Sequence, residues 1–304
     1  MDALHSLPPA SISSRWWDDS RARLPAAIGL ALIGSGCIYG LMWAVVGGSW
    51  EGPVSLRKPI LFGISGGLTL LSLGWAWAQL PRRRGDRWLA DSLAVALLIE
   101  VAAIDFQQWR GVASHFNRQT PFDSFLYDAL GLLILWVTLI AVDLTIRFFW
   151  QQTSLPADML LAARAGLVLL VVSCLLGIWV SVLGELRQQA GLEPERFGLA
   201  GVPKFPHGAV IHALQWLPLL AWGARRVGYP EQARLRLVAS ATLGTLLLGI
   251  FALAQTLLGR SRWDTTPATL LVLVVGLLLL AAPAVAIGVA AVASLIQPRV
   301  AMRR

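Results

Sequence analysis

Residues 267–296 read PATLLVLVVGLLLLAAPAVAIGVAAVASLI and contain no charged side chain. An α-helix rises about 1.5 Å per residue, so a run of about 20 apolar residues already crosses a hydrocarbon core about 30 Å thick. Comparable apolar runs occur at about 25–47, 58–80, 88–110, 120–149, 157–183, 206–224 and 232–257. The sequence therefore predicts an all-α integral membrane protein with about eight transmembrane helices.

The composition supports this fold class. Of 304 residues, 56% are hydrophobic and only 14% are charged, with a mean hydropathy of +0.65. Soluble domains are far less apolar. The formal net charge of +8 resides mainly in Arg residues of short loops, a pattern that indicates membrane orientation and contact with anionic lipid. We therefore expect the lipid bilayer as a partner and no nucleic acid.

The charge distribution also predicts orientation. Fifteen Lys and Arg residues flank the spans on the side of the N-terminus, against nine on the opposite side. This excess favours both termini in the cytoplasm of a multi-pass inner (plasma) membrane protein. Residues 1–24 lack the order of a cleavable signal peptide and are expected to form a cytoplasmic tail. His5, which lies in that tail, is expected to have no role.

The chain resembles itself when it is shifted along its own length. A shift of 137 positions aligns Cys37 and Gly40 with Cys174 and Gly177, and a shift of 146 aligns Lys58 with Lys204 and Thr120-Pro121 with Thr266-Pro267. Each Thr-Pro pair is typical of a helix N-cap followed by proline at the first helical position. Because each unit holds four spans, we predict two tandem four-helix halves in parallel orientation, 25–149 and 150–304.

Several glycines have the spacing typical of close helix packing. Gly36 and Gly40 are four residues apart, as are Gly63 and Gly67. Small residues at this spacing allow two helix backbones to approach closely in a membrane. We expect these glycines to pack helices together.

The polar residues within the apolar chain gather in two segments, Glu100 to Asp123 and Lys204 to Gln215. The predicted orientation assigns both to the non-cytoplasmic face. A carboxyl group at the depth of Glu100 must be protonated, hydrogen-bonded, paired or exposed to water, because an isolated charge there is costly. With spans ending near Arg110 and starting near Pro206, Glu100 and Gln215 share one depth. A site made from both segments requires the third and sixth spans to be neighbours.

Three histidines in these segments are the predicted metal or cofactor ligands: His115, His207 and His212. Gln215 is a further expected cofactor-binding residue, and a transition metal or haem is the suspected group. His207 and His212 are five residues apart, about 140° around a helix, so a regular helix does not direct both toward one ion. Glu100, Asp105 and Arg110 are the predicted catalytic residues, as ligand partners or proton carriers.

Five short motifs carry a resemblance to a family: Lys58-Pro59, Glu100, Arg110-Gly111, Ser114-His115-Phe116-Asn117 and His212-Ala213-Leu214-Gln215. The set resembles one found in a family of bacterial polytopic membrane proteins that has no established activity. The resemblance covers most of the chain. It implies the same multi-span fold and no particular reaction.

Three functional hypotheses remain open at this stage. The first is a buried His/Glu/Asp site at the non-cytoplasmic face that holds a metal or haem for redox or lipid-directed chemistry. The second is a proton-coupled transporter of small molecules, in which Glu100 carries the proton. The third is an accessory subunit of a membrane complex. Whether the protein is an enzyme is left open, as is the choice between a lipid-like and a small-molecule ligand.

Overall fold

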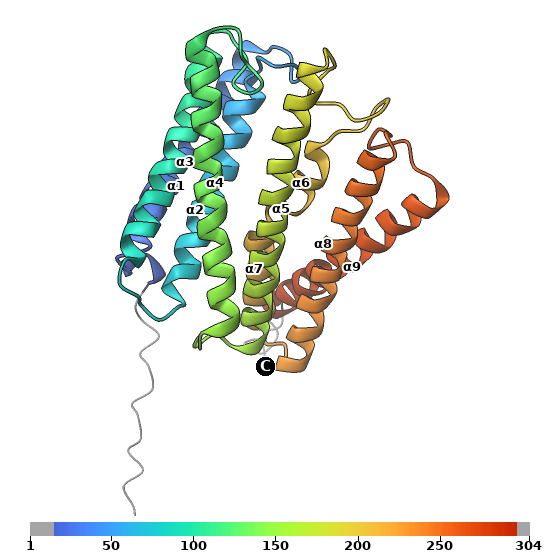
Figure 1. Cartoon of the computed structure of the whole chain (residues 1–304). Helices are drawn as coiled ribbons and strands as arrows, with labels where there is room; N and C mark the ends of the chain where they lie inside the picture. Colours follow the sequence, from blue (N-terminus) through green and yellow to red (C-terminus); the bar gives the residue numbers. More distant parts are fainter. Residues whose placement is uncertain (1–14, 297–304) are drawn as a thin grey trace, which may run out of the picture.

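The computed structural model describes residues 15–296, and this part of the chain is helical apart from connections and one isolated β-bridge (Figure 1). Its elements are η1 (Trp16–Asp18), α1 (Arg23–Val46), α2 (Arg57–Ala78), α3 (Asp86–Trp109), α4 (Pro121–Trp150), α5 (Ala157–Gln189), α6 (Lys204–Val210), α7 (Ala213–Arg226), α8 (Glu231–Leu257) and α9 (Pro267–Ile296). His5 and most of the predicted tail lie outside the described residues.

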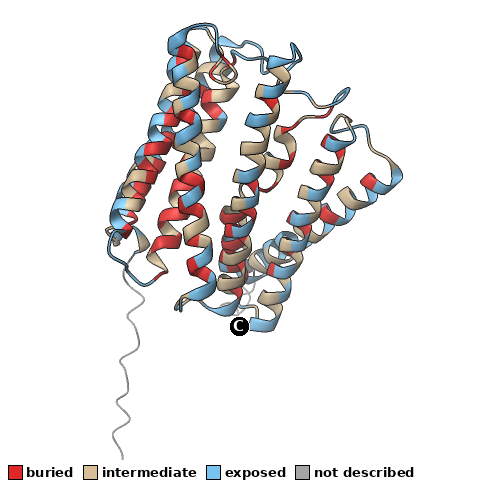
Figure 2. Ribbon diagram, viewed as in Figure 1, coloured by how far each residue is buried: buried red, intermediate tan, exposed pale blue. Residues whose placement is uncertain are grey.

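Six of the helices in this part of the chain are long and apolar enough to cross a membrane: α1, α2, α4, α5, α8 and α9. Large apolar side chains are exposed along their outer surfaces, and most buried residues face other helices (Figure 2). Lipid is the solvent that suits such a surface. The prediction of an all-α polytopic membrane protein is confirmed.

The connections divide between the two ends of the bundle. The α1–α2, α3–α4 and α5–α6 connections lie at one end, and the α4–α5 connection lies at the other (Figure 1). We call the first of these the His115 end, because His115 lies in the α3–α4 connection. Helix α3 packs against α1, α2 and α4, and α2 also packs against α7.

The predicted span at 206–224 is the one that differs most from the structure. It consists of two helices, α6 and α7, which are interrupted at Ile211 and His212. The prediction of one continuous helix is therefore wrong. The carbonyl of His207 accepts a hydrogen bond from the Ser173 hydroxyl, 2.9 Å away, where a continuous helix would use the amide of Ile211. The other predicted spans agree to within a few residues, although α5 extends to Gln189.

Helices α1 and α2 are in close contact through glycines. A Cβ atom added to Gly67 would collide with the carbonyl oxygen of Gly29, and one added to Gly36 would lie 2.9 Å from that of Ile60. Gly63 is equally constrained, whereas a Cβ at Gly40 would meet nothing within 4 Å. The packing role predicted from spacing is confirmed for Gly36, Gly63 and Gly67, and it is wrong for Gly40, which faces open space.

Both predicted N-caps are present. The amide of Asp123 donates to Thr120 Oγ1 at 3.1 Å at the start of α4, and the amide of Thr269 donates to Thr266 Oγ1 at 3.2 Å at the start of α9. In each case the hydroxyl satisfies an amide that has no partner within the helix.

Candidate functional site

The α3–α4 connection has a backbone that folds it back over the bundle. At the end of α3, Gly111 has a φ of +70°, and the amide of Val112 donates to the carbonyl of Gln107 at 3.1 Å, which is the Schellman pattern. Phe116 has a φ of +55°, the one positive φ among non-glycine residues 15–296. Such a conformation needs support from its surroundings.

That support comes from α5. The Gln188 side chain donates to the carbonyl oxygen of Phe116 at 2.8 Å, and the Phe116 ring occupies the space where a side chain at position 184 would lie. Gly184 therefore leaves room for the ring. The Asn117 side chain donates to the carbonyl of Ala113 at 3.0 Å and closes the loop on itself. Together these contacts hold His115 in a defined position.

Glu100 and His115 are the two predicted site residues that the fold brings together. Glu100 lies within α3 and is 3% exposed. Its Oε1 atom is 3.8 Å from Nε2 of His115, a separation too long for a direct hydrogen bond. Its Oε2 atom is buried and has no hydrogen-bond partner in residues 15–296. Ser114 Oγ lies 2.9 Å from His115 Nδ1, which leaves Nε2 as the ring nitrogen that faces Glu100.

Two aromatic rings pack against the histidine, whose side chain is 26% exposed. The Phe62 ring of α2 is 5.5 Å from the His115 ring, centroid to centroid, and the Tyr127 ring of α4 is 6.4 Å away. Rings from α2 and α4 and the carboxyl group of Glu100 from α3 therefore lie around one imidazole. An apolar surround of this kind disfavours a charged ring.

The charges near His115 act in the same direction. The pKa of His115 is lowered to about 4, chiefly by burial and also by the charges of Lys58 and Lys204, whereas the charge of Glu195 raises it. The imidazole is therefore neutral at pH 7. As a result, the carboxyl group of Glu100 faces a neutral histidine and has no cation as a partner.

His207 is held by α5 rather than by the other histidines. Its Nδ1 atom is 2.8 Å from the carbonyl oxygen of Ser173 and 3.0 Å from the Ser173 hydroxyl. Because a carbonyl only accepts, Nδ1 carries the proton and Nε2 has the lone pair. Gly177, one turn further along α5, lies against the same ring, and an added Cβ there would be 3.3 Å from Nδ1.

His212 and Gln215 lie at the break between α6 and α7. The carbonyl of His212 accepts from the amides of Gln215 and Trp216, at 3.0 and 3.2 Å, and so begins α7. The Gln215 side chain donates to the carbonyl of Leu68 in α2 at 3.4 Å. His212 Nδ1 and Gln215 Oε1 are buried without a hydrogen-bond partner in the described chain. The break is thus a second, smaller polar region.

Asp105 is directed toward α1. Its nearest polar neighbours are Ser35 and Tyr39, and Tyr39 accepts a 2.8 Å hydrogen bond from the indole of Trp109. Asp105 and Glu100 are five residues apart on α3, so they point in different directions. The two carboxyl groups do not form one site.

Arg110 joins the ends of two helices. It bonds the Gln107 side chain and the carboxylate of Asp123, and Gln107 donates to the same carboxylate at 2.9 Å. Thr120 donates to the other oxygen of Asp123 at 2.6 Å. This network fixes α3 to α4. It leaves Arg110 with structural partners and no contact with Glu100.

The histidines are not grouped as the predicted metal set requires. In residues 15–296, no three His, Cys, Asp or Glu side chains are positioned to hold a metal ion. Helix α2 packs against both α3 and α7, and the main packing contacts do not join α3 to α6 or α7. His115 and His207 accordingly have different hydrogen-bond neighbours, Ser114 and Ser173.

Three residues of the region were not identified from sequence: Phe62, Tyr127 and Ser173. Their types are ordinary within apolar helices and loops, and only the fold gives them a role. The Lys58-Pro59 motif was a usable signal, because it marks the start of the helix that carries Phe62.

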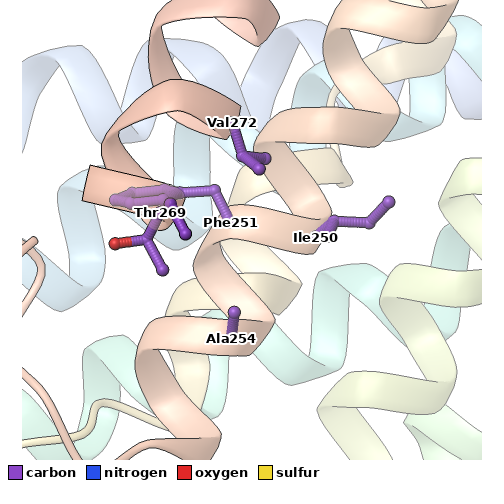
Figure 3. A pocket seen from close by; sticks show the side chains of 6 residues that line it. Ile250, Phe251, Ala254, Thr269 and Val272 are labelled. Carbon is purple, nitrogen blue, oxygen red and sulfur yellow. The ribbon is translucent and has the colours of Figure 1, made fainter. Parts of the chain in front are cut away.

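A pocket elsewhere in the structure lies between α8 and α9 (Figure 3). Its lining is Ile250, Phe251, Ala254, Ala268, Thr269 and Val272, which includes none of the predicted site residues. An apolar hollow on the surface of a membrane protein is suited to a lipid chain, and we assign it no chemistry.

The fold and the buried polar residues define the class of this protein: a polytopic α-helical membrane protein with ionisable side chains enclosed among its helices. No protein-family model, curated protein or solved structure matches the chain in the comparisons made. The family resemblance in the five motifs therefore stays a prediction.

Proposed function

We propose that this protein is a proton-coupled carrier of a small solute, in which Glu100 binds and releases a proton through His115. One observation carries the proposal. Glu100 is 3% exposed, one of its oxygens has no partner in the described chain, and the other faces a histidine at 3.8 Å. Ionisable groups in this situation are rare within membranes and commonly lie on ion or proton pathways.

The proposal includes eight spans with both termini in the cytoplasm. Six of these spans are the long apolar helices. Helix α3 is the seventh span, and the pair α6 and α7 together form the eighth. At about 1.5 Å per residue, the 24 residues of α3 are long enough to cross the hydrocarbon core. The excess of Lys and Arg on the side of the N-terminus supports this orientation, which directs the His115 end outward.

It also includes two tandem halves of parallel orientation. Gly29 of α1 packs against Gly67 of α2, and Gly166 of α5 packs against Ala213 and Leu214 of α7. The shift of 137 relates the two α1 and α5 glycines, and the shift of 146 relates Gly67 to Ala213. Equivalent contacts at equivalent positions support a duplication. Parallel repeats of this kind permit one half to rock against the other in known carriers.

The polar residues are unequal between the halves, which favours one proton site. At the shift of 146, Glu100 corresponds to Leu246. The second half instead contains the interrupted α6–α7 span with His212 at its centre. Interrupted helices accompany binding sites in carriers because they expose backbone groups at membrane depth. We therefore assign the proton to the first half and the interrupted helix to the second.

We do not propose a metal or haem, because no three His, Cys, Asp or Glu side chains within residues 15–296 are positioned to hold one ion. An absorption spectrum of the purified protein remains a useful control. A Soret band would require the function to be reconsidered.

Infrared spectroscopy tests the proposal directly. A protonated carboxyl group has a carbonyl-stretch band that disappears on ionisation, so the band is followed as the pH is changed. We expect a titrating band that is absent in Glu100→Gln and retained in Glu193→Gln, an exposed carboxylate of the α5–α6 connection. Solute uptake into proteoliposomes should then depend on the pH gradient in the wild type and not in Glu100→Gln. Identical infrared titrations of wild type and Glu100→Gln would refute the proposal.

A further inference from the structure

Helices α8 and α9 meet at a pair of glycines. A Cβ atom added to Gly244 would lie 2.7 Å from the carbonyl oxygen of Gly276, so the two backbones are in contact there. The hollow lined by Ile250 and Val272 lies between this contact and the α8–α9 connection (Figure 3). Because α9 is inclined to α8, the space between the two helices narrows toward the glycines (Figure 1).

The lining of the hollow is apolar. Its volume of about 300 Å³ is at the lower limit of pockets that enclose a small molecule, so it accommodates part of a flexible chain. Thr269 is the one polar residue of the lining, and its hydroxyl already accepts a hydrogen bond from the amide of Thr266 at 2.9 Å. Hydrocarbon is the chemistry that suits such a surface.

The hollow lies close to the end of the bundle that carries His115. The amide of Ala200 in the α5–α6 connection donates to the carbonyl of Gly259 at 2.9 Å, which fixes the α8–α9 connection at that end. Val272 is five residues from the first residue of α9, Pro267, and therefore at most about 8 Å further along the helix. The hollow thus spans the depth at which acyl chains meet their headgroups.

An arginine is linked to the hollow through two aromatic rings. The guanidinium carbon of Arg262 is 5.8 Å from the centre of the Phe205 ring, and this ring lies edge-on to Phe251 at 6.0 Å between centroids. Phe251 lines the hollow. Arg262 is exposed and forms no ion pair within residues 15–296. Its guanidinium group is therefore available to an anion beside the apolar surface.

The neighbours of Arg262 are typical of a membrane surface. Trp263 is 86% exposed, and tryptophan is enriched at the level of lipid headgroups. The connection at 258–266 contains two arginines, Arg260 and Arg262, against one acidic residue, Asp264. This excess of positive charge favours an anionic headgroup over a zwitterionic one.

We propose that an anionic phospholipid of the leaflet at the His115 end binds between α8 and α9, with one acyl chain in the hollow and its phosphate on Arg262. Guanidinium groups suit this role because they donate two parallel hydrogen bonds to a phosphate. The apolar lining and the arginine thus match the two parts of one lipid. The site goes beyond the proposed transport and does not depend on the proton of Glu100.

Photo-crosslinking tests the position of the lipid. The full chain is placed in phosphatidylcholine nanodiscs with a small fraction of phosphatidylglycerol that carries a diazirine on one acyl chain. Peptide mass spectrometry then reads the labelled residues after illumination. We expect label on residues 250–254 and 268–272, which added phosphatidylglycerol displaces and added phosphatidylcholine does not. Arg262→Gln removes the contact with the phosphate and should lower this labelling by about tenfold.

A second variant tests the hollow itself. Ala254→Leu places a larger side chain in the lining and should also lower the labelling. The matched controls are Arg196→Gln, whose exposed arginine already pairs with Glu193, and Ala282→Leu, an exposed position of α9 outside the lining. Both controls should label as the wild type does.

Three results would overturn the proposal. Label spread evenly over the lipid-facing helices would show that no lipid is held in place. Equal displacement by phosphatidylcholine, or unchanged labelling of Arg262→Gln, would remove the role of the arginine. A hollow without label, in a protein that native mass spectrometry shows to be a dimer, would assign this surface to a second copy of the chain.

Discussion

Ser173 Oγ lies 2.9 Å from the carbonyl oxygen of His207 and 3.0 Å from Nδ1 of the same residue. One fully buried hydroxyl on α5 therefore contacts both the backbone and the side chain of a histidine on α6. The carbonyl that it occupies is the one that would continue α6 through Ile211. The interruption between α6 and α7 thus depends on a contact between helices as well as on the local sequence.

Replacement of this hydroxyl tests that account. We expect Ser173→Ala to lower the free energy of unfolding by about 1–3 kcal/mol, since it leaves the carbonyl of His207 without the hydroxyl that donates to it. Ser181→Ala is the matched control, because Ser181 is exposed on the same helix and donates to the carbonyl of Gly177 in that helix. Thermal unfolding in detergent measures both. Equal melting temperatures for the two variants would contradict the assignment.

The glycine contact between α1 and α2 predicts a contrast between two identical substitutions. Gly67→Ala inserts a methyl group against the Gly29 carbonyl, so it should destabilise the protein by about 1–3 kcal/mol. Gly40→Ala meets open space and should be neutral or slightly stabilising, because alanine favours a helix. The melting temperatures of both variants check this. A Gly40→Ala variant that is as unstable as Gly67→Ala would show that the α1–α2 packing is misassigned.

Asp86 is the centre of a buried ion cluster at the other end of the bundle. Its Oδ1 atom is 2.7 Å from Nη1 of Arg147, and its Oδ2 atom is 3.2 Å from Nη1 of Arg21. Asp86→Asn should cost about 3–5 kcal/mol, because it leaves two buried guanidinium groups undercompensated. Asp143→Asn is the control, since Asp143 also pairs with Arg147 but is 43% exposed and lies further away, at 3.6 Å. Chemical unfolding should separate the variants clearly.

The histidine at the candidate site predicts a pH dependence of stability. His115 titrates near 6.5 when unfolded and near 4 when folded. Between these values the unfolded chain binds a proton that the folded chain does not, so stability is complete above pH 6.5 and falls as the pH decreases toward 4. Lys58, Lys204, Glu195 and Glu100 face this ring and remain unchanged in His115→Gln.

The variant should therefore lose less stability than the wild type between pH 6.5 and pH 4. Melting temperatures at several pH values measure the difference. If both proteins show the same slope, the pKa of His115 is the same in the folded and unfolded states, and packing by Phe62 and Tyr127 does not disfavour the charged ring.

The positions of the spans were predictable from the sequence because a run of about twenty apolar residues in lipid forms a helix, which hydrogen-bonds its own backbone groups. The caps at Thr120 and Thr266 were predictable for a similar reason, since they depend on neighbouring residues. The break between α6 and α7 was not predictable. It depends on Ser173, which lies 34 positions from His207 and approaches it only after α5 packs on α6.

The candidate site was predicted in part. The sequence indicated Glu100 and His115 separately, because an acid within an apolar run and a histidine in a short loop are both unusual. Their meeting depends on the backbone at Phe116, whose φ of +55° and contact with Gly184 have no signature in a single sequence. The sequence predicted that His207 and His212 group with His115, and the structure does not support this. The prediction relied on depth in the membrane, which does not specify which helices are neighbours.

The cluster at Asp86 has a consequence for biosynthesis. Arg21 precedes Asp86 by 65 positions in the chain, whereas Arg147 follows it by 61. A growing polypeptide therefore exposes Asp86 with one of its two arginines already made and the second still to be translated. Until α4 leaves the ribosome, the carboxylate of Asp86 in the nascent α1–α3 segment can pair with only one of its two arginines. Once Arg147 is made, its ion pair with Asp86 favours the packing of α4 against that segment.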